Sequence, residues 1–336
     1  MAGLKETLRI EESLELQELD KDIFKSIKLW KPSSGVGAFG GNIIAQAAHA
    51  AAKTVQVGYH LHSFHSYFIG IGDVDIPTGI IYLVDRIREG KSYATRSVKA
   101  IQRSRCIFTL LISFHKPEIN QAVLQHKIDL SKIPPPEDCQ SVETRLQTYI
   151  DDNLESIKPK MLEYLERQIE EHKLNAIQYR HTKSRRFDQS FSDDITSETY
   201  WLRSRAKIRS DPAFQKLVLA YASESVHSSF WYQWQRFNQL LVERHCSGQL
   251  GSAISNALGL NLAGGPRTSM FGYPSKSQYE FEVSEWMLYK VDAEVGKEGR
   301  GLLIGRIYSH DGRLIAVCTQ EAVVRVETTP KVVPKL

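Results

Sequence analysis

The chain has 336 residues, of which 42% are hydrophobic and 24% are charged, and these fractions exclude a disordered or fibrous protein. The formal net charge of +4 is too small and too dispersed for a nucleic-acid binder, although it suits a small ligand that carries phosphate. The length fits two modules of about 100–150 residues joined by connecting segments.

The sequence predicts no membrane span and no secretion signal. No apolar run approaches the ~20 residues that a span needs, and Lys5, Glu6 and Arg9 lie where a signal peptide is apolar. We therefore expect a protein that is made and kept inside the cell. Its four cysteines are scattered without a CxxC pair, so we expect no disulfide, no metal and no other cofactor.

The first clear element is an alanine-rich helix within residues 38–56, which opens with Phe39-Gly40-Gly41. Small residues recur on every side of it, as they do in a helix that a sheet wraps on most faces. Four β-rich runs follow, with polar or glycine turns between them. One central helix followed by an antiparallel meander is typical of a hotdog module. The predicted strands are 61–69, 79–89, 92–103 and 106–116.

Residues 117–175 have a different character. Three prolines at 134–136 exclude a helix interior or a central strand, because proline lacks the N–H and fixes its own φ. Within the charged stretch 160–171, Leu162, Leu165 and Ile169 have a helical spacing. We interpret this segment as a linker with a surface helix.

The second half repeats the first in a degraded form. Asp211-Pro212 is a strong helix start, with Asp at the N-cap and Pro at the first helical position. The turn 310–313 is of the hairpin type. Predicted strands are 176–181, 199–208, 279–283, 286–292, 301–308 and 314–326.

Several motifs stand out in each half of the chain. In the first half these are Phe39-Gly40-Gly41 with Gln46, His62 to Phe68 followed by Gly72-Asp73, and Arg88 to Tyr93 with Arg96-Ser97-Val98. In the second half they are Tyr221-Ala222-Ser223, Glu285 to Tyr289 and Thr319-Gln320-Glu321. Together these motifs resemble the acyl-CoA thioesterase II family over roughly residues 10–327. The resemblance implies an α+β fold, a double hotdog in which two antiparallel β-sheets each wrap a central α-helix. The expected divisions are an N-terminal hotdog module (1–116), the linker (117–175), a C-terminal hotdog module (176–328) and a tail (329–336).

His62 and His65 are the most conspicuous titratable pair in the first half. At positions i and i+3 of a regular strand they lie on opposite faces, so they do not easily share a metal. We interpret them as core or interface histidines.

Thioester hydrolysis needs a water held against the acyl carbon, a group to take its proton, and donors for the developing oxyanion. The resemblance implies a carboxylate, a hydroxyl residue and a glutamine that orient the water, and a backbone N–H that polarises the carbonyl. Carried over by position, these catalytic residues are Glu224, Thr268 and Gln320.

Each assignment has a competing interpretation. Glu224 replaces the family's Asp, and a glutamate on a helix surface is the alternative. Gln320 lies on a strand, where a glutamine is more often solvent-exposed, although its amide suits holding one water. An ungapped count from Trp286 places Met270 at the hydroxyl position, and Thr268 takes it only with a two-residue insertion.

The last three residues, Pro334-Lys335-Leu336, resemble the Ser-Lys-Leu class of peroxisomal address. They predict binding to the peroxisomal import receptor, with the cytoplasm as the alternative location. Acyl-CoA is the expected substrate. The sequence does not decide between a monomer and a homo-oligomer.

Three functions compete at this point. The leading one is hydrolysis of an acyl-CoA to a free acid and CoA, in fatty-acid or specialised metabolism. The second is a catalytically weak or inactive paralogue that binds acyl-CoA. Hydration of an enoyl-CoA ranks last, because the chain shows no convincing Asp/His pair near the second helix.

Overall fold

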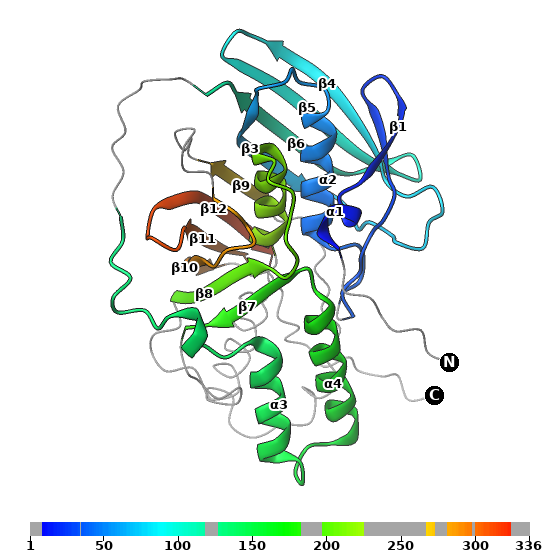
Figure 1. Ribbon diagram of the computed structural model, residues 1–336. Coiled ribbons are helices and arrows are strands. Elements are labelled where there is room, and N and C mark those ends of the chain that lie inside the picture. Colours follow the sequence, from blue (N-terminus) through cyan, green and yellow to red (C-terminus); the bar gives the residue numbers. More distant parts are fainter. Residues whose placement is uncertain are drawn as a thin grey trace, which may run out of the picture.

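The computed structural model describes residues 9–33, 35–117, 127–182, 197–224, 267–272, 281–297 and 300–323. In the first half, six strands wrap the helix α2, Gly40–Ala52, while the short helix α1, Ile10–Ser13, lies beside it (Figure 1). The alanine and isoleucine side chains of α2 are buried along nearly its whole length. The small alanines let the sheet approach the helix closely. The strands are β1 (Leu16–Asp20), β2 (Ile23–Ser26), β3 (His60–Phe68), β4 (Ile81–Glu89), β5 (Tyr93–Gln102) and β6 (Arg105–His115).

Gln46 fixes α2 within the first half. Its Nε2 donates to the carbonyls of Ser13 and Lys28 at 2.7 and 2.8 Å, and its Oε1 accepts from the Tyr82 hydroxyl at 2.8 Å. A buried amide with all these partners stabilises one position of the helix. The role of Gln46 is therefore structural.

A helical hairpin connects the halves and lies outside the sheet (Figure 1). It follows the short 3-10 helix η1, Pro136–Asp138, and consists of α3, Val142–Asn153, and α4, Pro159–Leu174. The two helices pack through a small apolar cluster of their own. Arg205 of the second half donates to the carbonyls of His172 and Asn175 at 2.9 and 3.0 Å, so it anchors the C-terminal end of α4.

The second half has the same plan as the first. Residues 212–224 are helical and almost entirely buried. Asp211 accepts from the N–H of Ala213 at 3.1 Å, so it caps the helix start as predicted. The strands are β7 (Ile177–His181), β8 (Ser197–Ser204), β9 (Arg267–Gly272), β10 (Met287–Lys297), β11 (Arg300–Tyr308) and β12 (Leu314–Val323).

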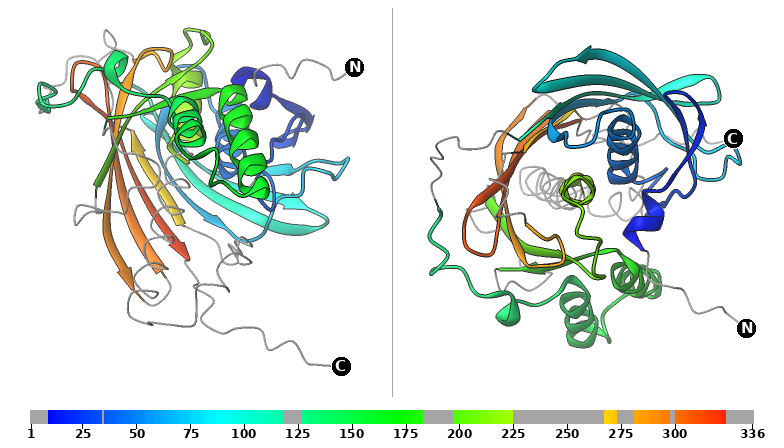
Figure 2. Two further views of the ribbon diagram at one scale, coloured as in Figure 1. Left: turned by 90° about the horizontal axis from the view of Figure 1, so that it is seen from below. Right: turned by 45° about the horizontal axis from the view of Figure 1, so that its top comes forward.

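The two halves join edge to edge. In the described part of the chain the strands form a 12-stranded sheet, ordered β1-β2-β4-β5-β6-β3-β9-β12-β11-β10-β8-β7. The antiparallel pair β3–β9 links the halves at its centre, with Ser66 opposite Thr268. Figure 2 shows the sheet curling around α2 and the helix 212–224, with α3 and α4 outside. The expected double hotdog is confirmed.

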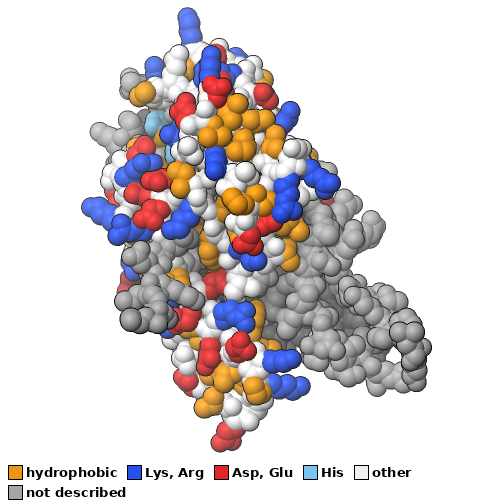
Figure 3. Space-filling model, turned by 90° about the vertical axis from the view of Figure 1, so that its right-hand side faces the viewer, with side chains coloured by type: hydrophobic (Ala, Val, Ile, Leu, Met, Phe, Trp, Pro, Cys, Tyr) orange, Lys and Arg blue, Asp and Glu red, His pale blue; other side chains and the backbone are white. Residues whose placement is uncertain are grey.

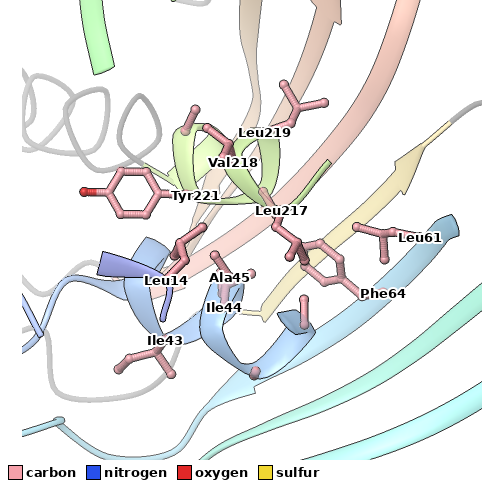
Figure 4. Close-up of a cluster of buried hydrophobic side chains, with 14 of the residues drawn as sticks. Leu14, Ile43, Ile44, Ala45, Leu61, Phe64, Leu217, Val218, Leu219 and Tyr221 are labelled. Carbon is pink, nitrogen blue, oxygen red and sulfur yellow. The ribbon is translucent and has the colours of Figure 1, made fainter. Parts of the chain in front are cut away.

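The core lies where the two helices meet the central strand. Ile43 and Ile44 of α2, Leu217 of the second helix, and Phe64 of β3 gather in one cluster (Figure 4). All four side chains are at most 3% exposed. This packing holds the start of α2 against the second helix.

Several sequence predictions differ from the structure. Residues 281–283 form no strand, because the N–H of Val283 bonds the Gln215 side chain at 2.8 Å and a turn follows. Strand β8 ends at Ser204, not at 208. The elements β1, β2, β9 and α3 were not predicted. Four of the five residues of β1 are exposed, so its sequence lacks the alternation that marks a half-buried strand.

Candidate active site

Glu224 lies on the inner side of the second half, at the last described position of the helix 212–224. Its side chain is only 6% exposed, so the surface-glutamate interpretation does not hold. The buried run that starts at Phe214 carries the residue into the space enclosed by the sheet. A carboxyl group withdrawn from water in this way is a marker of a functional site.

Gln320 meets Glu224 from the sheet that wraps the helix 212–224. It lies on β12, is 2% exposed, and donates from Nε2 to both carboxylate oxygens of Glu224 at 3.1 and 3.2 Å. Its Oε1 is buried and has no hydrogen-bond partner in the described structure. Buried amide oxygens are normally paired, so this one is available to accept a hydrogen bond from a bound molecule.

Strand β9 places Thr268 directly beside Gln320 in the sheet. Its backbone pairs with Gln320 of β12 on one side and with Ser66 of β3 on the other. Residues paired in this way share a face of the sheet. Met270, which the ungapped count favours, pairs instead with Cys318, two residues before Gln320 on β12.

The start of α2 faces this group from the first half. A Cβ built on Gly40 would lie 3.1 Å from Oε1 of Glu224 and 3.0 Å from the Phe68 ring. Phe39 at the N-cap gives α2 no side-chain cap within the described residues. The first N–H groups of a helix lack intrahelical acceptors, so this end of α2 presents donors next to the carboxylate.

The catalytic groups predicted from the sequence all lie in the second half, although Phe39-Gly40-Gly41 is among the motifs of the first. The structure adds the N-terminus of α2 to the site. The signal in the sequence was the glycine pair, because a Cβ on Gly41 would lie 2.6 Å from the Tyr221 carbonyl oxygen. Glycine at both positions lets the two helices approach closely.

Burial sets the electrostatics of the site. It raises the pKa of Glu224 to about 8, while the hydrogen bond from Gln320 acts in the opposite direction. A base with a pKa near the working pH suits proton transfer. Burial likewise raises the pKa of the Cys318 thiol to about 12, so this cysteine is not a thiolate nucleophile at neutral pH.

The predicted targeting residues Pro334, Lys335 and Leu336 fall outside the described residues. Across the described ranges, no group of three or more His, Cys, Asp or Glu is placed to hold a metal ion. No helix in that same part of the chain combines the length and apolarity needed to cross a membrane.

Comparisons with known proteins agree with the fold. Residues 27–115 match the acyl-CoA thioesterase N-terminal domain and residues 159–324 match the C-terminal domain. Human acyl-coenzyme A thioesterase 8 is 31% identical over 322 residues, 94% of this chain and 88% of that protein. The peroxisomal acyl-coenzyme A thioester hydrolase 1 of Saccharomyces cerevisiae is 35% identical over 108 residues, 31% of this chain and 30% of that protein.

A solved structure shows the same architecture. The acyl-CoA thioesterase II TesB2 from Mycobacterium marinum superposes with a TM-score of 0.63 at 23% identity, covering 95% of this chain and 99% of that one. Two family domains, full-length sequence similarity and a shared double hotdog point the same way. The chain belongs to the acyl-CoA thioesterase family, whose activity is that of an acyl-CoA thioester hydrolase.

Proposed function

We propose that this chain hydrolyses an acyl-CoA to a free carboxylic acid and CoA by direct attack of water. The observation that carries the proposal is the buried pair of Glu224 and Gln320, bonded at 3.1 and 3.2 Å. The pair places a proton acceptor and an unpartnered amide oxygen side by side in the interior of the second half. A single water can donate one hydrogen to the Glu224 carboxylate and the other to the Gln320 amide oxygen. Its oxygen then keeps a lone pair for attack on the acyl carbon.

The reaction balances without a covalent intermediate. Ionised Glu224 takes a proton from the water as its oxygen bonds to the thioester carbon. The tetrahedral oxyanion then collapses, the C–S bond breaks, and the sulfur of CoA receives the proton from Glu224. The products are the carboxylic acid and CoA, so one carboxyl group acts in turn as base and acid.

Two further groups complete the proposed site. Thr268 is paired with Gln320 across β9 and β12, and we assign to its hydroxyl the role of orienting the attacking water. The donors at the start of α2, beside Gly40, are assigned to the thioester carbonyl oxygen. Positive helix N-termini stabilise negative charge at their first turn, which suits the oxyanion of the tetrahedral state.

We also propose that the enzyme works in peroxisomes, on fatty-acid or specialised acyl-CoAs. The support is the terminal Pro334-Lys335-Leu336, which resembles the tripeptides that the import receptor binds, together with the name of the yeast relative. A fluorescent protein joined to the N-terminus of the full chain tests this. Punctate peroxisomal signal that becomes diffuse when Leu336 is removed supports the address, and diffuse signal in both forms favours the cytoplasm.

Thiol release tests the activity. Purified protein at high concentration is mixed with a panel of acyl-CoAs, and free CoA is trapped with a chromogenic disulfide. Release of CoA above the background rate supports hydrolysis. Binding of CoA without thiol release from any member supports the inactive acyl-CoA-binding paralogue instead.

A further inference from the structure

Three aliphatic side chains are exposed on the two loops that border the start of α2. Val36 is 56% exposed, and Ile69 and Ile71 are each 57% exposed. Single exposed aliphatic residues are ordinary, but a cluster of them from separate segments marks a binding surface. We call these three residues the aliphatic rim. Figure 3 shows that hydrophobic side chains also gather on the upper part of one face, among charged ones.

The loops that carry the rim are held together. The N–H of Ala38 donates to the carbonyl of Gly72 at 2.7 Å. A Cβ on Gly37 would lie 2.2 Å from Cγ2 of Ile71, so the isoleucine side chain rests on the glycine backbone. On the other side, the N–H groups of Ile69 and Gly70 both donate to the Ile107 carbonyl, at 2.8 and 2.9 Å. The rim is therefore a fixed surface.

The rim is continuous with the candidate active site. Gly40 follows Val36 by four residues. It lies against the Glu224 carboxylate, because a Cβ on Gly40 would be 3.1 Å from Oε1 of Glu224. Phe68 precedes Ile69, lies against Gly40, and packs at a tilt on Phe108 with ring centroids 4.9 Å apart. The Phe68 ring and the Glu224 carboxylate thus both border Gly40, and Phe68 is the residue next to the rim in the chain.

The charges beside the rim select which part of an acyl-CoA lies there. Asp73 and Asp75 directly follow the second loop. The Asp73 carboxylate pairs with Arg103 at 3.3 Å, while Asp75 adds a further negative charge. Since Arg103 offsets the charge of Asp73, the Asp75 carboxylate is the group that disfavours the CoA phosphates and anionic lipid surfaces here, because like charges repel. The apolar acyl chain suits the surface best.

We propose that the aliphatic rim binds the acyl chain of the substrate and makes the enzyme selective for chains long enough to reach it. This inference rests on the proposed function, because it uses the position of the thioester at Glu224. Val36, Ile69 and Ile71 are specificity-determining residues in this account. Each added methylene that reaches the rim strengthens binding until the surface is covered.

Binding of non-hydrolysable S-alkyl-CoA thioethers tests the rim without requiring turnover. Ethyl-, hexyl- and decyl-CoA are titrated into wild type and into the double variant Val36→Ser/Ile71→Ser. Both positions are more than half exposed, so the variant is expected to fold. We expect wild-type affinity to rise with chain length, and the variant to lose about tenfold for decyl-CoA and little for ethyl-CoA.

The double variant Val57→Ser/Leu154→Ser is the matched control. Val57 is 103% exposed and follows the far end of α2, and Leu154 is 60% exposed and follows α3. We expect its chain-length profile to equal that of wild type. Parallel profiles for wild type and the rim variant overturn the proposal.

Two further outcomes separate the possible failures. If the rim variant changes the oligomeric state in size-exclusion chromatography with light scattering and leaves the chain-length profile intact, the rim is a subunit contact and the proposal is wrong. Absence of thiol release from every acyl-CoA contradicts the proposed hydrolysis alone, because the thioether titration still reports on the rim.

Discussion

The side-chain amide of Gln320 donates to both carboxylate oxygens of Glu224, although the two residues are 96 positions apart in sequence. One comes from a helix and the other from a strand of the sheet that wraps it. Both are buried, which keeps their mutual geometry fixed. The proposed water position depends on this contact.

Gln320→Ala removes a donor and an acceptor from the proposed water site. We expect kcat to fall by about 10²-fold, the typical loss for one such positioned group, while the fold is retained. Steady-state thiol release measures the effect. Gln102→Ala is the control, since Gln102 is also buried but its side chain bonds Asp73 and Gly79 and not Glu224. An unchanged kcat in Gln320→Ala would show that the amide does not take part.

Glu224→Asp shortens the carboxyl arm by one methylene. The variant restores the residue type of the family but draws the carboxylate back from Gln320 Nε2. A displacement of about 1 Å at a reacting group lowers rates by up to 10²-fold, so we expect a lower kcat than wild type. A rate equal to or above that of wild type contradicts the geometry described here, and crystal structures of both forms would show which contacts had moved.

Glu224→Gln also changes how stability depends on pH. Burial raises the pKa of Glu224 from 4.5 to about 8, so the folded state binds a proton that the unfolded chain releases. This contribution to stability is present at low pH and is lost as the pH rises from about 4.5 to about 8. We expect Glu224→Gln to melt at a higher temperature than wild type at pH 8. Equal melting curves at all pH values would show that the carboxyl is not desolvated.

Gly40→Ala tests the contribution of the start of α2. The added methyl group would lie 3.1 Å from Oε1 of Glu224 and 3.0 Å from the Phe68 ring, so it would crowd the carbonyl site while leaving the helix intact. We expect a large loss of kcat, of about tenfold or more, with little loss of stability. Gly70→Ala is the comparison, because its methyl group comes no closer than 3.4 Å to a neighbour. Full activity of Gly40→Ala would remove α2 from the mechanism.

Arg96→Ala tests what holds the far end of α2. The Arg96 side chain is fully buried and donates to Thr54 Oγ1, the Thr54 carbonyl and the Arg88 carbonyl at 2.7–3.0 Å. We expect a loss of about 3–5 kcal/mol in the free energy of unfolding by urea. The half-exposed pair of Arg86 with Asp22 provides the control, and Arg86→Ala should cost about 0.5 kcal/mol. Similar losses in the two variants would contradict the buried role.

The sequence predicted the elements whose patterns are local. The Ala-rich run of α2 and the Asp211-Pro212 start of the second helix appear as expected, because propensity and capping act within a few residues. The edge strand β1 was not predicted, since most of its side chains face solvent. Strand β9 is short, and its place depends on pairing with β3 and β12, which no local pattern encodes.

The histidines show the limit of a regular strand model. The register of β3 shifts between Leu61 and Ser63, so a bulge falls at His62. The His62 ring contacts Ser113 at 3.4 Å and packs near Tyr93, while His65 is exposed. A bulge reverses the alternation of faces, and the predicted placement of the two histidines on opposite faces is therefore wrong.

The candidate site was named from resemblance, and its physical basis appears only in three dimensions. Glu224 and Gln320 each had a solvent-exposed interpretation in the sequence. Packing of the second helix against β12 buries both, and no spacing within either segment indicates that. The pairing of Thr268 with Gln320 likewise appears only in the strand register.

The pH profile of kcat/KM tests the central claim most directly. Since Glu224 must be ionised to act as base, we expect kcat/KM of wild type to rise with pH and to level off above about pH 8. Loss of the hydrogen bond from Gln320 removes an interaction that lowers this pKa, so the inflection in Gln320→Ala should move to higher pH. A profile that lacks the inflection in wild type, or that is identical in the variant, contradicts a Glu224 base held by Gln320.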